Sequence, residues 1–241
     1  MSKVICLWAS PRNISTALMY SFAQRSDVKV LDEPFYAHYL KNINPDIDHP
    51  GKKEILDNQS ADLKTVVKEI DILKQQYECV FIKNMTHHLR GADFSFAEDW
   101  YNIILTRDPQ KAIISFSKVI PNPTMDDLGY KLQYDLANFF TSKKINFKVI
   151  SSENLLKNPK EVLNDVCEFS KKKFNPQMLS WRKGGIVEDG VWAKYWYKNV
   201  HNSDGFSPWV NKSSEEINAN QFELLEEATH YYQQLISYLK F

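Results

Sequence analysis

The chain has 241 residues and 43% of them are hydrophobic, which is enough for the core of one large α/β domain. Thirty Lys and Arg balance thirty Asp and Glu, so the net charge favours neither nucleic acid nor an anionic membrane as a partner. The cysteines, Cys6, Cys79 and Cys167, lie far apart in apolar stretches, which is typical of reduced core residues rather than of a disulfide frame or a zinc site.

The sequence begins with a short strand pattern instead of the long apolar segment and small-residue cleavage site of a signal peptide. No later run reaches the length of a transmembrane helix. We therefore expect a cytoplasmic protein that does not associate with a membrane.

The first elements along the chain are a buried strand, a tight turn and a helix. An apolar run over residues 4–9 gives way to Ser-Pro-Arg-Asn at residues 10–13, and helical spacing then continues to residue 25. The first backbone N–H groups of a helix have no partner within the helix, and the helix dipole adds partial positive charge. Arg12 adds a cation and Ser15 and Thr16 add hydroxyl donors, so this junction is predicted to bind an anion.

Further strand and helix patterns alternate along the chain. The predicted strands are residues 28–31, 79–82, 101–105 and 147–150, and the predicted helices are residues 61–77, 109–118, 125–143 and 158–169. Residues 36–58 lack a clean period and are interpreted as an irregular excursion, a candidate for a loop that covers a substrate. Repeated strand-then-helix units predict an α/β fold with a parallel sheet between two layers of helices, and we expect one domain over residues 1–241.

The chain ends in an irregular aromatic region after residue 176 and in a helix predicted from Ser214 to Leu239. The apolar residues of that helix alternate at spacings of three and four, which suits either packing on its own domain or a short dimerising coil. The pattern covers fewer than four heptads, so the first interpretation is preferred, and a homodimer remains an alternative.

Charged side chains follow each predicted strand. They are Arg12, Glu33, Lys83 with His87 and His88, Arg107, and Glu153. In parallel sheets ligands bind at the carboxyl ends of the strands, so these side chains are expected to meet at one edge. Arginines and a lysine beside a helix N-terminus suit an anionic, nucleotide-like ligand, and one carboxylate among them could act as a base.

Several motifs resemble the sulfotransferases that use 3′-phosphoadenosine 5′-phosphosulfate (PAPS). These are Pro11-Arg-Asn-Ile-Ser-Thr16, Thr106-Arg107-Asp-Pro with Ser115 eight residues after Arg107, Leu31-Asp-Glu33-Pro34, and Ser152-Glu-Asn-Leu-Leu156 with the helix that follows it. Asp32-Glu-Pro-Phe-Tyr-Ala-His-Tyr39, His49-Pro-Gly51 and Asp189-Gly-Val-Trp-Ala193 are similar to small bacterial sulfotransferase-like proteins, some of which carry names that associate them with branched-chain aminotransferases.

The resemblance implies a P-loop-like α/β/α sandwich with about five parallel strands. It places Arg12, the backbone at Asn13 and Ile14, and the hydroxyls of Ser15 and Thr16 around the 5′-phosphosulfate. It assigns Arg107 and Ser115 to the 3′-phosphate. The reaction it implies moves a sulfuryl group from PAPS, as co-substrate and without a metal, to a hydroxyl or amine of a small-molecule acceptor.

Two sets of residues are candidate bases for that reaction. Glu33 is the first candidate, with Arg12 stabilising the departing phosphate and Lys83 as a further candidate for that role. His87 or His88 is the rival, because cytosolic members of the family carry a catalytic histidine after the third strand. Adjacent residues of a strand point to opposite faces, so at most one of the two histidines is expected in the site.

The sequence also departs from the family pattern. Ile14 stands where the family has glycine, and a β-branched residue is expected to keep φ negative there. An adenine-stacking tryptophan of the first helix is replaced by Ala17, and Arg182-Lys183-Gly184 is either a second 3′-phosphate loop or a solvated basic turn. These departures leave open a catalytically inactive nucleotide-binding regulatory protein, whereas a P-loop kinase is disfavoured because its Gly-x4-Gly-Lys-Ser/Thr motif is missing.

Overall fold

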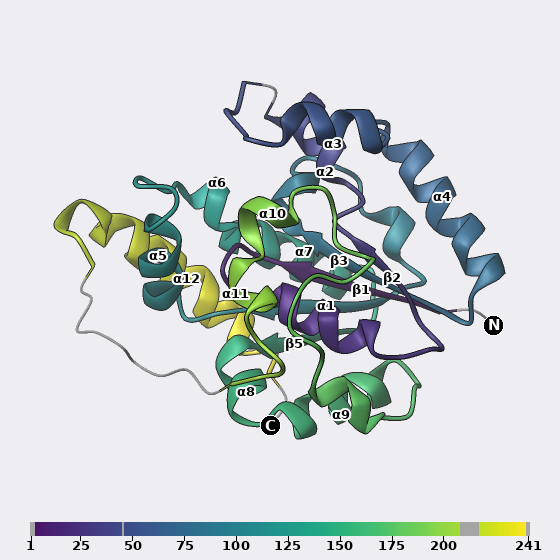
Figure 1. Ribbon diagram of the computed structural model, residues 1–241. Helices are drawn as coiled ribbons and strands as arrows, with labels where there is room; N and C mark the ends of the chain where they lie inside the picture. The colour runs from purple at the N-terminus through teal and green to yellow at the C-terminus, as the bar shows by residue number, and fades with distance from the viewer. Residues whose placement is uncertain (1–2, 45, 208–216, 240–241) are drawn as a thin grey trace.

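The computed structural model describes residues 3–44, 46–207 and 217–239 (Figure 1). Five parallel strands form one sheet in the order β2-β3-β1-β4-β5. The strands are β1 (Lys3–Ala9), β2 (Lys29–Asp32), β3 (Cys79–Met85), β4 (Tyr101–Thr106) and β5 (Phe147–Ser151). The predicted strands and their parallel arrangement are confirmed, and each boundary is within three residues of the expected one.

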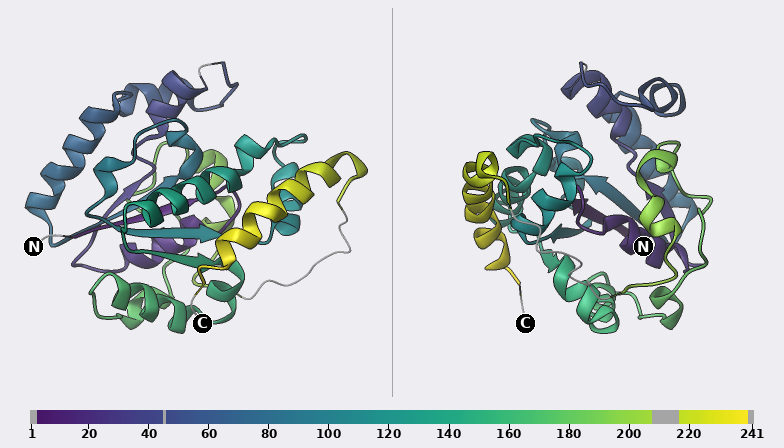
Figure 2. Two further views of the ribbon diagram at one scale, coloured as in Figure 1. Left: turned by 180° about the vertical axis from the view of Figure 1, so that it is seen from behind. Right: turned by 60° about the vertical axis from the view of Figure 1, so that its left-hand side comes forward.

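Helices cover both faces of the sheet (Figure 2). The longer ones are α1 (Ser15–Ala23), α4 (Leu63–Gln76), α5 (Pro109–Ser117), α7 (Tyr130–Ser142), α9 (Pro159–Phe169) and α12 (Phe222–Ile236). The shorter ones are α2 (Tyr36–His38), α3 (Lys52–Asn58), α6 (Met125–Leu128), α8 (Ser152–Lys157), α10 (Ala193–Trp196) and α11 (Lys198–His201). A π-helix, η1 (Tyr39–Ile43), and 3-10 helices η2 (Thr86–Leu89), η3 (Ser95–Ala97), η4 (Pro176–Leu179) and η5 (Ala219–Gln221) complete the set.

Alternation along the central strand divides the core into two layers. Ile5, Leu7 and Ala9 of β1 lie in one apolar cluster with residues of α1 and α9, whereas Val4, Cys6 and Trp8 lie in the other with residues of α4 and α7. Side chains of a strand point alternately to its two faces, and both faces of this strand are buried. The continuous apolar run at the start of the chain follows from that burial.

Three predicted segments differ from the structure. Residues 36–58 contain α2, η1 and α3 rather than an irregular excursion. The helix expected over residues 125–143 is interrupted at Gly129, which has φ of +73° between α6 and α7. His87 and His88 lie in the 3-10 helix η2 instead of on a strand, so the strand geometry assumed for them was wrong.

The C-terminal helix packs on its own chain. Leu224, Leu225, Tyr231 and Tyr232 of α12 join an apolar cluster with Ile113 of α5 and Tyr130 of α7. This is the preferred interpretation of the sequence pattern, and residues 214–216 of the predicted helix lie outside the described residues. Dimer formation stays a prediction.

Candidate functional site

The turn between β1 and α1 has an unusual backbone. Arg12 has φ of +64° and Ile14 has φ of +62°, while Asn13 between them is not among the residues with positive φ. Alternation of this kind turns successive N–H groups toward one concave side, which is a geometry that binds anions. The expectation that Ile14 would keep φ negative was therefore wrong, because the surroundings of the turn outweigh the intrinsic preference of a β-branched residue.

Those surroundings consist of buried hydrogen bonds to the turn. The Asn13 side-chain amide donates to the carbonyl of Leu105 at 2.6 Å, and Ser152 Oγ donates to the carbonyl of Asn13 at 2.7 Å. The Arg107 guanidinium donates to the carbonyl of Arg12. The carbonyl groups of Asn13 and Arg12 are thus occupied from α8 and from the loop after β4, while the Asn13 side chain ties the turn to β4. The opposite side of the turn, which carries the N–H groups, is therefore the side suited to an anion.

The first residues of α1 continue this surface. Ser15 is buried, and its backbone N–H donates to the Asn13 side-chain oxygen at 3.3 Å. Thr16 is half-buried one residue further into the helix. Both residues thus lie in the first turn of α1, where the sequence predicts them.

Arg12, Arg107 and Ser115 lie together. Arg12 Nε donates to Ser115 Oγ at 3.0 Å, and Arg107 contacts the Arg12 backbone as described above. The sequence predicts that Arg12 and the Arg107–Ser115 pair hold opposite ends of a nucleotide. The structure brings all three residues into one group. Burial lowers the pKa of both arginines, which nevertheless remain cations at neutral pH.

A buried charge cluster lies at the ends of β2 and β3. Lys83 Nζ contacts Asp32 Oδ1 at 3.1 Å, Glu33 Oε1, and the Tyr197 hydroxyl at 2.5 Å. The side chains of Lys83, Asp32 and Glu33 are 0%, 1% and 5% exposed. All three N–H donors of the ammonium group therefore have acceptors within the protein. Lys83 can reach a departing phosphate only by releasing one of them.

Burial and charge determine the proton affinity of this cluster. Burial raises the pKa of Glu33 above its ordinary value, and the attraction of Lys83 offsets only part of this effect. Burial alone would lower the pKa of Lys83, but the two carboxylates outweigh it, so the pKa is raised and the ammonium stays charged. A carboxylate with a raised pKa is a better proton acceptor, as a general base requires.

The two histidines next to Glu33 differ in position. His88 Nε2 lies 3.8 Å from Glu33 Oε2, and the His88 ring stacks on Tyr36 and Tyr39 with centroid distances of 4.4 and 4.9 Å. His87 instead meets Tyr39 edge to face. Burial lowers the pKa of His87 to about 4 and that of His88 well below its usual range, so both rings are neutral at pH 7. His88 is thus the nearer of the pair to Glu33, and the catalytic role of His87 stays a prediction.

The aromatic region after residue 176 closes over the charge cluster. The Tyr197 hydroxyl lies 2.8 Å from both Asp32 carboxylate oxygens, and the backbone N–H of Gly190 donates to Asp32 Oδ2 at 3.0 Å. Trp192 Nε1 donates to the Tyr197 hydroxyl at 3.0 Å. Sequence reasoning identified this aromatic stretch but not the role of Tyr197, because a single tyrosine carries no spacing signal.

The Arg182–Gly184 stretch lies at the surface. Arg182 and Lys183 are exposed, and Lys183 Nζ lies 3.7 Å from Asp204. This arrangement matches the solvated basic turn rather than a part of the site.

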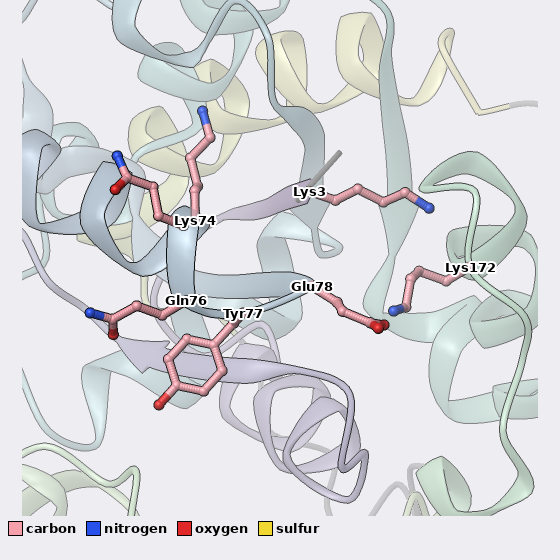
Figure 3. Close-up of a pocket in the computed structure, with 7 residues that line it drawn as sticks. Lys3, Lys74, Gln76, Tyr77, Glu78 and Lys172 are labelled. Atoms are coloured by element: carbon pink, nitrogen blue, oxygen red, sulfur yellow. The ribbon is translucent and has the colours of Figure 1, made fainter.

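A pocket of about 500 Å³ lies away from this site (Figure 3). Its lining includes Lys3 and Glu78, which lie at and just before the amino ends of β1 and β3. Its lysines already have partners: Lys3 donates to the carbonyl of Lys171, Lys74 to Asp99, and Lys172 pairs with Asp27. The pocket therefore lies at the amino edge of the sheet, away from the charged side chains at the carboxyl ends of the strands.

Comparison with known proteins identifies the family. The family model described as "Sulfotransferase domain" matches residues 2–238. The chain belongs to the sulfotransferase family. It is 34% and 35% identical, over 99% of its length, to two Arabidopsis thaliana proteins named branched-chain-amino-acid aminotransferase-like protein 2 and 1. The chain spans 42% of the length of each of these relatives.

Solved sulfotransferase structures share the fold. The sulfotransferase domain from the curacin biosynthetic pathway matches with a TM-score of 0.56 and 19% identity, over 100% of this chain and 99% of that one. The sulfotransferase domain from the Synechococcus PCC 7002 olefin synthase matches with a TM-score of 0.57 and 16% identity, over 95% of each chain. The sulfotransferase from Alicyclobacillus acidocaldarius matches with a TM-score of 0.56 and 11% identity, over 98% of this chain and 96% of that one. The sulfotransferase fold predicted from the motifs is thus confirmed.

Two findings concern the described residues as a whole. Their His, Cys, Asp and Glu side chains form no group of three or more that could hold a metal ion. None of the helices described is both long enough and apolar enough to span a bilayer.

Proposed function

We propose that this chain transfers a sulfuryl group from PAPS to a hydroxyl or amine of a small-molecule acceptor. The observation that carries the proposal is the strained turn at residues 12–14. It contains Arg12, Arg107 contacts it, and the buried carboxylate of Glu33 lies at the end of β2 in the same sheet. Membership of the sulfotransferase family supports the reaction class. The choice of PAPS as donor rests on the motif resemblance and on the cationic character of the turn.

In this proposal the turn holds the donor. The N–H groups at Asn13 and Ile14, the hydroxyls of Ser15 and Thr16, and the Arg12 guanidinium surround the 5′-phosphosulfate. Arg107 and Ser115 hold the 3′-phosphate, and Arg12 gives up its bond to Ser115 when the ligand enters. Donors that are already in place stabilise charge on the departing phosphate without reorganisation.

Glu33 then serves as the base. The acceptor oxygen or nitrogen forms a bond to sulfur, the bond from sulfur to the bridging phosphate oxygen breaks, and that oxygen leaves with the electron pair. Glu33 takes the proton of the acceptor, and Oε2 is the oxygen suited to this because Lys83 contacts Oε1. The raised pKa of Glu33 means that activity falls as the pH falls through that pKa, because the base is then protonated.

Nucleotide binding can be measured without knowing the acceptor. Adenosine 3′,5′-bisphosphate titrated calorimetrically is expected to bind the wild type, and Arg107→Ala to lose about 2 kcal/mol or more of the binding free energy because a buried cation is removed. Arg90→Ala is the matched control, since Arg90 pairs with Asp126 at the surface. A wild type that does not bind, or an Arg107→Ala variant that binds equally well, contradicts the nucleotide site.

Transfer is tested by incubating the protein with sulfur-labelled PAPS and pooled small metabolites. Glu33→Gln is expected to reduce label transfer by 100-fold or more, on the order of a general base contribution, while nucleotide affinity changes little. A variant as active as the wild type would remove Glu33 from the role of base. Binding without any transfer would favour the inactive nucleotide-binding alternative.

A further inference from the structure

Tyr197 holds a central position in the buried charge cluster. Its hydroxyl lies 2.5 Å from Lys83 Nζ, 2.8 Å from each Asp32 carboxylate oxygen, and 3.4 Å from Glu33 Oε1. It accepts from the Trp192 indole and from Lys83, so its single proton is directed to a carboxylate. The residue is only 5% exposed, and its neighbours reach it from β2, β3 and the start of α10.

We propose that the Tyr197 hydroxyl is a positioning group for Glu33: by binding Asp32, it keeps the Lys83 ammonium shared with Glu33. This inference rests on the proposed function in one respect, namely that Glu33 is the base. The hydrogen-bonding argument itself depends only on the geometry of the cluster.

The cluster holds more negative than positive charge, so its carboxylates need hydrogen bonds as well as Lys83. One ammonium faces two buried carboxylates, and a buried charge is costly unless it is paired or hydrogen-bonded. Asp32 receives the Tyr197 hydroxyl and the Gly190 N–H in addition to Lys83. Without the hydroxyl, Asp32 would draw Lys83 more strongly and Glu33 would lose part of its counter-charge.

The other groups that face Glu33 leave this balance unchanged. His88 from η2 is neutral at pH 7, because burial lowers its pKa. Tyr36 from α2 is also neutral, because burial raises its pKa well above 10. Besides burial, the protonation of Glu33 therefore depends on three neighbouring groups, Lys83, Asp32 and Tyr197. Removing the Tyr197 hydroxyl is expected to raise the pKa of Glu33.

Tyr197→Phe tests this with little change in packing. Lys83 Nζ lies 4.7 Å from the centroid of the Tyr197 ring, and phenylalanine keeps that contact. Tyr20→Phe is the matched control, because the Tyr20 hydroxyl is also buried and donates to a carboxylate, Asp189, at 2.7 Å but touches neither Asp32 nor Lys83. The titration of Glu33 is followed by carbon-13 NMR of labelled glutamate carboxyl groups, with the signal assigned through Glu33→Gln.

We expect the midpoint for Glu33 to move to higher pH in Tyr197→Phe and to stay in place in Tyr20→Phe. Asp32→Asn should move it to lower pH, because the competing charge is removed and Lys83 is left to Glu33. If Tyr197→Phe fails to fold, Asp32→Asn still tests the competition between Asp32 and Glu33 for Lys83 on which the proposal depends. An unchanged Glu33 midpoint in Tyr197→Phe, or in Asp32→Asn, overturns the proposal.

The transfer assay provides a second measurement. In Tyr197→Phe the acid limb of the pH profile of kcat should move upward, so transfer is lost at mildly acidic pH and recovers at alkaline pH, while KM for PAPS stays near the wild-type value. A structural role alone would lower activity at every pH. If the wild type transfers no sulfate, the proposed function fails, whereas the NMR titration still tests Tyr197.

Discussion

Backbone strain at single residues marks the carboxyl edge of the sheet. Five described non-glycine residues have positive φ: Arg12, Ile14, Glu33, Lys144 and Lys171. The last two follow the ends of α7 and α9, where left-handed residues are common. Arg12 and Ile14 instead lie in the turn between β1 and α1, and Glu33 follows the last residue of β2, in the proposed site. Such conformations cost about 1–3 kcal/mol each and persist only where neighbouring contacts enforce them, as the bonds to residues 12–14 do here.

A pair of substitutions at Ile14 measures that strain. Ile14→Gly and Ile14→Ala both remove the side chain, but only glycine adopts positive φ without penalty. We expect Ile14→Gly to be more stable than Ile14→Ala by about 1 kcal/mol, which reverses the usual ranking of the two residues in a helix. Urea unfolding of both variants gives the difference. If Ile14→Ala were as stable as Ile14→Gly or more stable, the left-handed conformation of Ile14 would be contradicted.

At the scale of elements, the position of α5 connects fold to function. The helix begins after Arg107 with Asp108 as its cap and Pro109 as its first residue, and it ends just after Ser115. The Asp108 side chain accepts from the backbone N–H of Lys111 at 3.0 Å. The same helix therefore connects the two residues proposed for the 3′-phosphate, so the orientation of its first turn affects both.

Removing the N-caps of α5 and α4 in turn should distinguish an effect on stability from an effect on nucleotide binding. Asp108→Ala is expected to lower the free energy of unfolding by about 1 kcal/mol and to weaken adenosine 3′,5′-bisphosphate binding several-fold. Asp62→Ala removes the equivalent cap of α4, where Asp62 accepts from the N–H of Thr65 at 2.8 Å. It should lower stability by a similar amount, about 1 kcal/mol, and leave binding unchanged. Equal binding by both variants would contradict the proposed role of α5.

At the scale of the whole molecule, the buried histidines make stability depend on pH. The pKa of His87 is about 4 in the folded protein, below the value of an exposed histidine. Between those two values the unfolded chain binds more protons, so the histidine's contribution to stability is present above the unfolded pKa and is lost as the pH falls toward 4. The raised pKa of Glu33 acts in the opposite direction, because it favours protonation of the folded state.

His87→Phe isolates the histidine contribution. Between pH 7 and pH 5 the wild type should lose about 1–2 kcal/mol more of its unfolding free energy than His87→Phe does. The exposed residue His230 provides the control, and His230→Phe should behave as the wild type. Urea midpoints at the two pH values measure the loss. Identical losses in His87→Phe and the wild type would show that His87 is not buried in its neutral form.

The local sequence pattern predicted those elements whose conformation depends mainly on their own residues. Apolar runs predicted five parallel strands, and Asp108-Pro109 predicted the start of α5. The residues at strand ends could be identified because parallel strands end at one edge. The pattern was a poor guide over residues 36–58, where short helices pack through isolated aromatic residues such as Tyr36 and Tyr39 and no period develops.

The sequence by itself determined the sheet, the sulfotransferase motifs and the set of charged residues at its carboxyl edge, because periodicity and capping depend on near neighbours in the chain. Only the tertiary structure decided the conformation of Ile14 and the partners of Lys83. Ile14 adopts positive φ because Leu105 and Ser152, about 90 and 140 residues away, hold the turn. Lys83 meets Tyr197 because α10 and the segment before it fold back over β2, and no local spacing encodes a contact across 114 residues.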